Sequence, residues 1–156
     1  MLQRIQTVYL TIVFIFTMLA VLLPLGNFDF DGVNSALKIT GLELPANAPS
    51  ELRPGWQSIA LSVLCFVIMG LTVYTVFQYK RRRFQIQLGK VIVLLHMVLV
   101  FSAFYYIDFY TEKLSGAAFS HSLAIYLPLI SMILVIVANK AIKKDEELVQ
   151  SADRIR

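Results

Sequence analysis

Apolar residues in this chain gather into four long blocks that are separated by short polar segments. The blocks run from Thr7 to Gly26, Trp56 to Tyr79, Leu88 to Ile107 and Phe119 to Ala138. A helix that crosses a hydrocarbon layer about 30 Å thick needs roughly 20 mostly apolar residues, and each block has that length. The pattern predicts an all-α membrane protein in which four transmembrane helices form one up-and-down bundle, a single domain over residues 1–156.

Composition agrees with a membrane environment. Hydrophobic residues make up 58% of the chain and charged residues only 15%, whereas soluble domains carry about 25% charged residues. The first block is longer than the roughly 7–15 apolar residues of a secretory signal and lacks a small-residue cleavage motif, so we expect it to remain as the first helix. The single cysteine, Cys65, lies in the second block and excludes an intramolecular disulfide.

The charge distribution predicts the orientation. With four spans, both termini and the loop between the second and third spans lie on one side. Short loops rich in lysine and arginine stay in the cytoplasm, so the sequence predicts a multi-pass membrane protein with cytoplasmic N and C termini. That side holds four acidic residues and eleven of the fourteen cations: Arg4, Lys80, Arg81, Arg82, Arg83, Lys90, Lys140, Lys143, Lys144, Arg154 and Arg156.

The longest outer segment, residues 27–55, contains one candidate for extended structure. Leu37, Ile39 and Leu42 are near strand-like spacing, and the Thr-Gly pair between them suits a turn. A short β-hairpin over Ala36–Leu44 is one interpretation. An irregular loop is the other, because three prolines follow this stretch.

The polar segments on the predicted cytoplasmic side are the candidate contact surfaces. Four consecutive cations, Lys80 to Arg83, can hold anionic lipid headgroups, or they serve only as the topology signal. A contact with the phosphates of a nucleic acid or a ribosome is a third interpretation. We expect the following residues to contact lipid or a partner: Lys80, Arg81, Arg82, Arg83, Gln85, Lys143, Lys144, Asp145, Glu146, Glu147, Leu148, Asp153 and Arg154.

The C-terminal tail, residues 139–156, follows the fourth block without proline or glycine, so we expect the fourth helix to continue into the cytoplasm. Its acidic run at 145–147 leaves the fourth span at the depth where the basic loop leaves the second span. This arrangement predicts that the tail docks on the basic loop. An isolated helix this short frays, so Leu148 and Val149 on its apolar edge should be covered by the bundle, the membrane surface or another protein.

Inside the spans, His96 is the one titratable group at depth, about 12 Å from the predicted inner boundary. Polar groups at such a depth are candidates for function, although a neutral histidine can also pack by bonding to a serine or a carbonyl. Gly70 and Gly89 are candidates for close approach between helices. The sequence has no nucleophile–base pair, phosphate loop or metal-spaced cluster, so we expect no enzymatic activity, no metal and no cofactor.

Three sequence segments are similar to those of a known protein family: "QRIQTVYL", "KRRRFQIQLGK" and "ANKAIKKDEELVQSADRIR". They resemble a Bacteroidota family of small four-span inner-membrane proteins that is catalogued as a domain of unknown function. The resemblance implies a four-helix protein with both ends in the cytoplasm, and it supplies no activity or catalytic residue.

Two functions fit these features. The first is a non-enzymatic accessory or scaffold subunit that contacts other membrane protein subunits and membrane lipids through its cytoplasmic face. The alternative is a small transporter or channel in which His96 lines a polar path.

Overall fold

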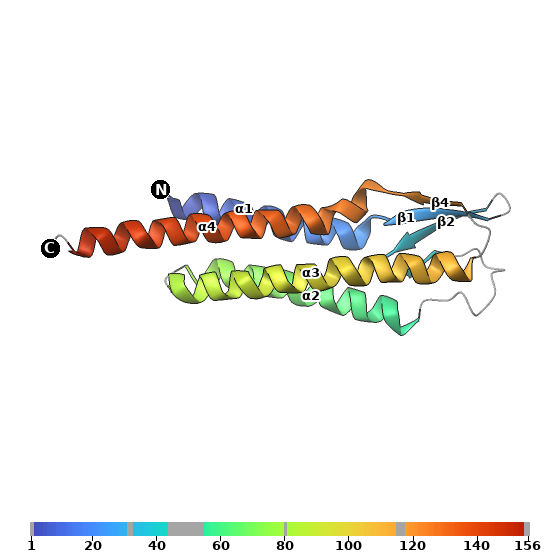
Figure 1. The fold of residues 1–156 in the computed structure, drawn as a ribbon, viewed down its shortest axis with the longest axis horizontal. Helices are drawn as coiled ribbons and strands as arrows, with labels where there is room; N and C mark the ends of the chain where they lie inside the picture. The colour runs from blue at the N-terminus through green and yellow to red at the C-terminus, as the bar shows by residue number, and fades with distance from the viewer. Residues whose placement is uncertain (1, 31–32, 44–54, 80, 115–117, 155–156) are drawn as a thin grey trace.

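The computed structural model describes residues 2–30, 33–43, 55–79, 81–114 and 118–154. Within these ranges the chain forms four long helices, one short 3₁₀ helix and a small four-stranded sheet (Figure 1). In chain order the elements are α1 (Leu2–Leu22), β1 (Gly26–Phe30), β2 (Val33–Lys38), β3 (Gly41–Leu42), α2 (Trp56–Phe77), α3 (Arg82–Lys113), β4 (Ala118–His121), η2 (Leu123–Tyr126) and α4 (Leu127–Arg154).

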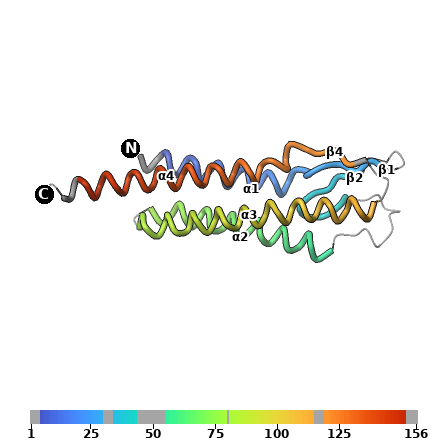
Figure 2. The backbone as a smooth tube through the Cα atoms, in the orientation of Figure 1, coloured from blue at the N-terminus to red at the C-terminus, as the bar shows by residue number. Residues whose placement is uncertain are grey.

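The long helices form an antiparallel bundle. Helix α1 packs against α2 and α4, and α3 packs against the same two helices, so the contacts close into a ring. The start of α1, the α2–α3 turn and the end of α4 lie together at one end, which we call the turn end (Figures 1 and 2). The strands lie at the opposite, sheet end. Helix α4 projects beyond the other helices at the turn end.

The outer surface of the bundle is apolar. Each of the four long helices in the described ranges is long and apolar enough to cross a membrane. Large side chains such as Phe66, Leu94 and Phe101 are exposed by 60% or more. Such a surface would be unfavourable in water, because it presents a continuous apolar area to the solvent. In a bilayer the same side chains face hydrocarbon, which is the environment the sequence predicts.

Two buried threonines inside the bundle bond to their own helices. Thr17 donates to the Val13 carbonyl at 2.8 Å, and Thr72 donates to the Ile68 carbonyl at 2.8 Å. These i−4 bonds satisfy polar side chains where no water is at hand, so the bundle tolerates them without a partner on another helix.

Two predicted span boundaries are wrong. Helix α1 ends at Leu22 because Pro24 has no amide N–H and disfavours helical backbone before it. Gly26, the predicted end of the first span, is instead the first residue of β1. The predicted start of the fourth span, Phe119, lies in β4, and the helical structure starts at Leu123.

The sheet has the order β3-β2-β1-β4, with every neighbouring pair antiparallel. Strands β2 and β3 form the predicted hairpin, in which Leu37 pairs with Leu42; Leu44 lies outside the described residues. Gly41 has φ 147°, a conformation that glycine adopts without strain. The sequence does not predict strands β1 and β4, so the expectation of an all-α fold needs correction.

The sheet is buried against the helices through its apolar face. Phe28, Leu37 and Ile39 are fully buried and belong to one core cluster with Tyr110 and Leu114. Helix α3 continues six residues past its predicted end to Lys113, so it reaches beyond the spanning block and supplies this surface. A sheet with strands this short cannot bury its own core, and the extension of α3 completes it.

Candidate functional site

The most developed polar site lies at the turn end, where α3 begins beside the projecting part of α4. Arg82 Nη2 lies 3.0 Å from Asp145 Oδ2, and Arg82 Nη1 donates to the Asp145 backbone carbonyl at 3.2 Å. Arg83 Nε donates to Glu146 Oε1 at 2.9 Å. Two consecutive arginines thus hold two consecutive carboxylates, an arrangement that we call the tail clasp. The predicted docking of the acidic tail on the basic loop is present in the structure.

The two pairs of the tail clasp differ in their exposure to solvent. The side chains of Arg82 and Asp145 are only 25% and 13% exposed, whereas that of Arg83 is 83% exposed. A sheltered ion pair is screened less than an exposed one, and losing one partner leaves a poorly solvated charge. An exposed pair adds only about 0–1 kcal/mol. Arg82–Asp145 is therefore the stronger of the two attachments.

Beyond the tail clasp, α4 is held by bonds within its own turns. Glu146 Oε1 also accepts from Gln150 Nε2 at 3.0 Å, and Lys143 Nζ lies 3.7 Å from Glu147 Oε1 at i, i+4 spacing. Of the three covers expected for the apolar edge of this extension, the bundle itself, as far as its residues are described, does not provide one. Leu148 and Val149 remain 51% and 45% exposed, so the described part of the bundle does not cover them.

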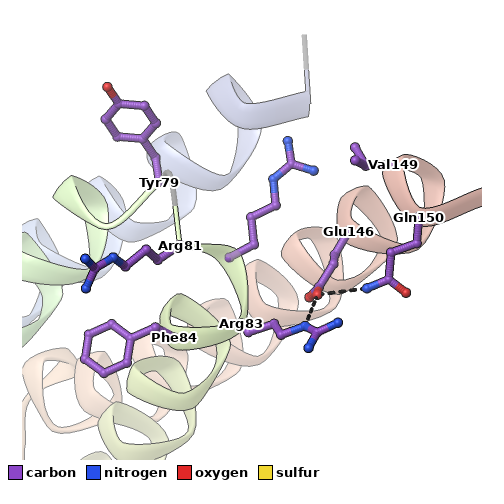
Figure 3. A pocket seen from close by; sticks show the side chains of 8 residues that line it. Tyr79, Arg81, Arg83, Phe84, Glu146, Val149 and Gln150 are labelled. Carbon is purple, nitrogen blue, oxygen red and sulfur yellow. Dashed lines mark hydrogen bonds and ion pairs between the residues drawn. The ribbon is translucent and has the colours of Figure 1, made fainter. Parts of the chain in front are cut away.

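A groove of about 690 Å³ lies between the α2–α3 turn and the extension of α4, and we call it the arginine groove. Figure 3 shows Arg83 directed toward Glu146, while Arg81 lies with Phe84 on the other side. The groove holds three guanidinium groups and one carboxylate, so its net charge is positive. It is lined by Tyr79, Arg81, Arg82, Arg83, Phe84, Glu146, Val149 and Gln150.

The remaining predicted contact residues fall into three groups. Arg81, Lys143 and Lys144 are exposed at the turn end, as a contact surface requires. Gln85 is only 3% exposed and donates to the Thr75 carbonyl at 3.1 Å, so it joins α3 to α2 and does not lie on the surface. Lys80 and the side chains of Asp153 and Arg154 lie outside the described residues.

His96 is fully buried in the middle of α3. Its Nδ1 lies 2.9 Å from the Ile92 carbonyl, and its Nε2 has no partner among the described residues. Ser131 Oγ is likewise buried and has no partner in the described ranges. Histidine and serine together supply a donor and an acceptor at this depth.

One groove is not predicted from the sequence. A cavity of about 320 Å³ lies between α3 and α4, one to two helical turns from the tail clasp. Three lysines, Lys90, Lys140 and Lys143, are the charged residues of its lining. The sequence signal that could have revealed this cavity is a lysine near the start of the third apolar block and another just after the end of the fourth. No group of three or more histidine, cysteine or acidic side chains within the described ranges is placed to hold a metal ion.

The fold is a small bundle of four helices, each long and apolar enough to cross a membrane, with a small sheet at one end and a clasped helical extension at the other. The profile of one protein family, described as "Domain of unknown function (DUF4293)", matches residues 2–155. The chain belongs to this family, which confirms the resemblance to a family of unknown function; a Bacteroidota origin stays a prediction. No curated protein matches the chain.

Proposed function

We propose that the protein is a non-enzymatic accessory or scaffold subunit of an inner-membrane assembly, and that the turn end faces the cytoplasm. Its partners are other membrane protein subunits, and its surroundings are membrane lipids. The segments of the sequence that this orientation puts in the cytoplasm contain eleven of the fourteen cations, which supports the proposed orientation.

The observation that carries the proposal is the clasped but uncovered extension of α4. A short helical extension without tertiary contacts would fray, whereas this one is held in a fixed direction by Arg82–Asp145 and Arg83–Glu146. It presents two exposed apolar side chains, Leu148 and Val149, beyond the end of the bundle. A rigid helix with an exposed apolar edge and charged flanks is the form in which many helices dock into a partner's groove. The tail clasp reduces the entropic cost of docking, because the helix is already ordered before it binds.

Site-specific photocrosslinking in native membranes tests this function. A crosslinking side chain at Leu148 or Val149 should yield the same protein adduct, whereas one at Phe66, which is 62% exposed on the flank of α2, should not. Arg82→Glu should remove the adduct, and the charge swap Arg82→Glu with Asp145→Arg should restore it. An adduct that is indifferent to the charge reversal, or a protein that reacts only with lipid, would contradict the proposal.

A second candidate function, a small transporter or channel, rests on two buried polar atoms that have no partner in the described part of the chain, His96 Nε2 and Ser131 Oγ. Polar groups in the middle of a bilayer often line a path for ions or protons. His96 does not line the arginine groove, nor the apolar groove between α2 and α3 near Trp56 and Tyr106. Flux through liposomes that contain the purified protein decides between the two functions. A flux that His96→Leu abolishes would favour transport over scaffolding.

A further inference from the structure

The groove between α3 and α4, which we call the lysine groove, combines a cationic rim with an apolar floor. Its charged lining residues are Lys90 of α3 and Lys140 and Lys143 of α4, and we place them at its rim. Ile86, Val93 and Ile136 form its floor, and Asn139 completes the lining. The spacing on both helices follows successive turns, so the groove runs along the bundle axis.

The charge of the lysine groove is not balanced by its own lining. Three lysines are the charged residues of its lining, and no carboxylate lines it among the described residues. Lys143 has one described ion pair, with Glu147 at 3.7 Å, and these side chains are 71% and 65% exposed, so the pair is weak and easily exchanged. The arginine groove differs, because Arg82 and Arg83 are already committed to Asp145 and Glu146.

The position of the lysine groove relative to the predicted membrane surface favours a phospholipid over a soluble anion as its ligand. Lys90 lies two residues inside the predicted start of the third span, and Lys140 lies two residues beyond the predicted end of the fourth. The rim is therefore at the headgroup level, and Val93 and Ile136 lead from it into the hydrocarbon layer. A soluble anion would use only the rim. A phospholipid would use the rim for its phosphate and the floor for an acyl chain.

We propose that the lysine groove binds one anionic phospholipid of the cytoplasmic leaflet. The phosphate contacts the ammonium groups of Lys90 and Lys140, and an acyl chain lies on Val93 and Ile136. Basic pockets between transmembrane helices on the cytoplasmic side are suited to anionic headgroups. This inference rests on the proposed orientation of the turn end, but it does not depend on a protein partner of the α4 extension.

Native mass spectrometry of the intact protein, with phosphatidylglycerol and phosphatidylcholine of identical chains, tests the inference. The double variant Lys90→Gln, Lys140→Gln should weaken phosphatidylglycerol binding about 25-fold, or fivefold for each ammonium lost, without changing phosphatidylcholine binding. The control variant, Arg81→Gln with Lys144→Gln, removes the same charge at the same end, outside the groove. It should change binding less than about twofold. Millimolar glycerol phosphate should not displace the lipid.

Three results would overturn the inference. An equal loss in the control pair would mean that the lipid senses only the overall charge of the turn end. Unchanged binding in the Lys90, Lys140 variant would mean that the lipid does not occupy the groove. Displacement by glycerol phosphate would identify a soluble anion as the ligand. If the glutamine variant does not fold, Ile136→Trp, which fills the floor and keeps every charge, should weaken the lipid adduct. Crosslinking at Leu148 reports separately on the proposed scaffold function.

Discussion

Gly89 of α3 lies so close to Asn139 of α4 that a methyl group at position 89 would be 2.5 Å from Asn139 Cγ and Nδ2. The predicted close helix approach at Gly89 is therefore present, and the asparagine side chain occupies the space. Gly70, the other candidate, faces outward, and a methyl group at position 70 would meet no described atom within 4 Å. The prediction of a close approach within the chain is wrong at that position.

Gly89→Ala should lower the free energy of unfolding by up to about 1–3 kcal/mol, because the Asn139 side chain must leave its place to accept the methyl group. Gly70→Ala is the matched control. It should be neutral or should stabilise α2 by up to about 1 kcal/mol, since alanine favours helix more than glycine does. Thermal unfolding in a neutral detergent measures both. Equal destabilisation by the two variants would mean that packing against Asn139 does not govern position 89.

Removing Arg82 should affect the α4 extension more than removing Arg83. Arg82→Gln leaves Asp145, which is 13% exposed, without its ion pair, and should cost about 1–3 kcal/mol of local stability. Arg83→Gln should cost less than about 1 kcal/mol, because its side chain is 83% exposed. Hydrogen exchange of the amides at 145–151 gives the measurement. Equal protection in both variants would show that the tail clasp does not order the extension.

Gly26→Ala should disrupt the pairing of β1 with β4. A methyl group at this position would lie 2.6 Å from the Ser120 carbonyl oxygen, and that backbone atom cannot move without loss of the strand. Asn27→Ala is the control, since Asn27 is exposed and its pairing uses the backbone alone. Amide exchange at residues 119–121 should rise in the first variant only. Unchanged protection in both would contradict the assigned register.

His96→Leu should keep the bundle folded and leave its thermal stability unchanged or raised by about 1 kcal/mol. The substitution removes a buried nitrogen, Nε2, that has no partner among the described residues. Thermal unfolding in detergent measures the stability, and the crosslink at Leu148 shows whether the variant still folds and docks. A marked loss of stability would indicate that His96 bonds to Ser131 or to a bound water in the folded state.

Reporter fusions test the orientation directly. A reporter after residue 86 or after residue 156 should be cytoplasmic, and one after residue 47 or 114 should be exported. The asymmetric distribution of lysine and arginine is the physical reason for this expectation. An exported reporter at residue 156 would reverse the orientation on which the scaffold function and the lipid site depend.

The sequence by itself determined the features that depend on one segment at a time. A helix must be long and apolar to cross a bilayer, so four apolar blocks were enough to predict the four long helices. The absence of proline and glycine after Ala138 was enough to predict the continuation of α4. The tail contact was predictable because opposite charges occur at matching depths on two predicted helices.

Only the tertiary structure decided the features that depend on which segments meet. Strand β4 exists because residues 118–121 pair with β1, about ninety positions earlier, and the glycine at position 26 leaves room for Phe119. The sequence pattern of a short apolar segment such as this one fits a strand and the start of a helix equally well, so only its pairing partner distinguishes the two. The lysine groove likewise depends on how α3 packs against α4, where the Asn139 side chain lies against Gly89. Hydrophobic periodicity records the face that a segment buries, but it does not record the neighbour against which that face is buried.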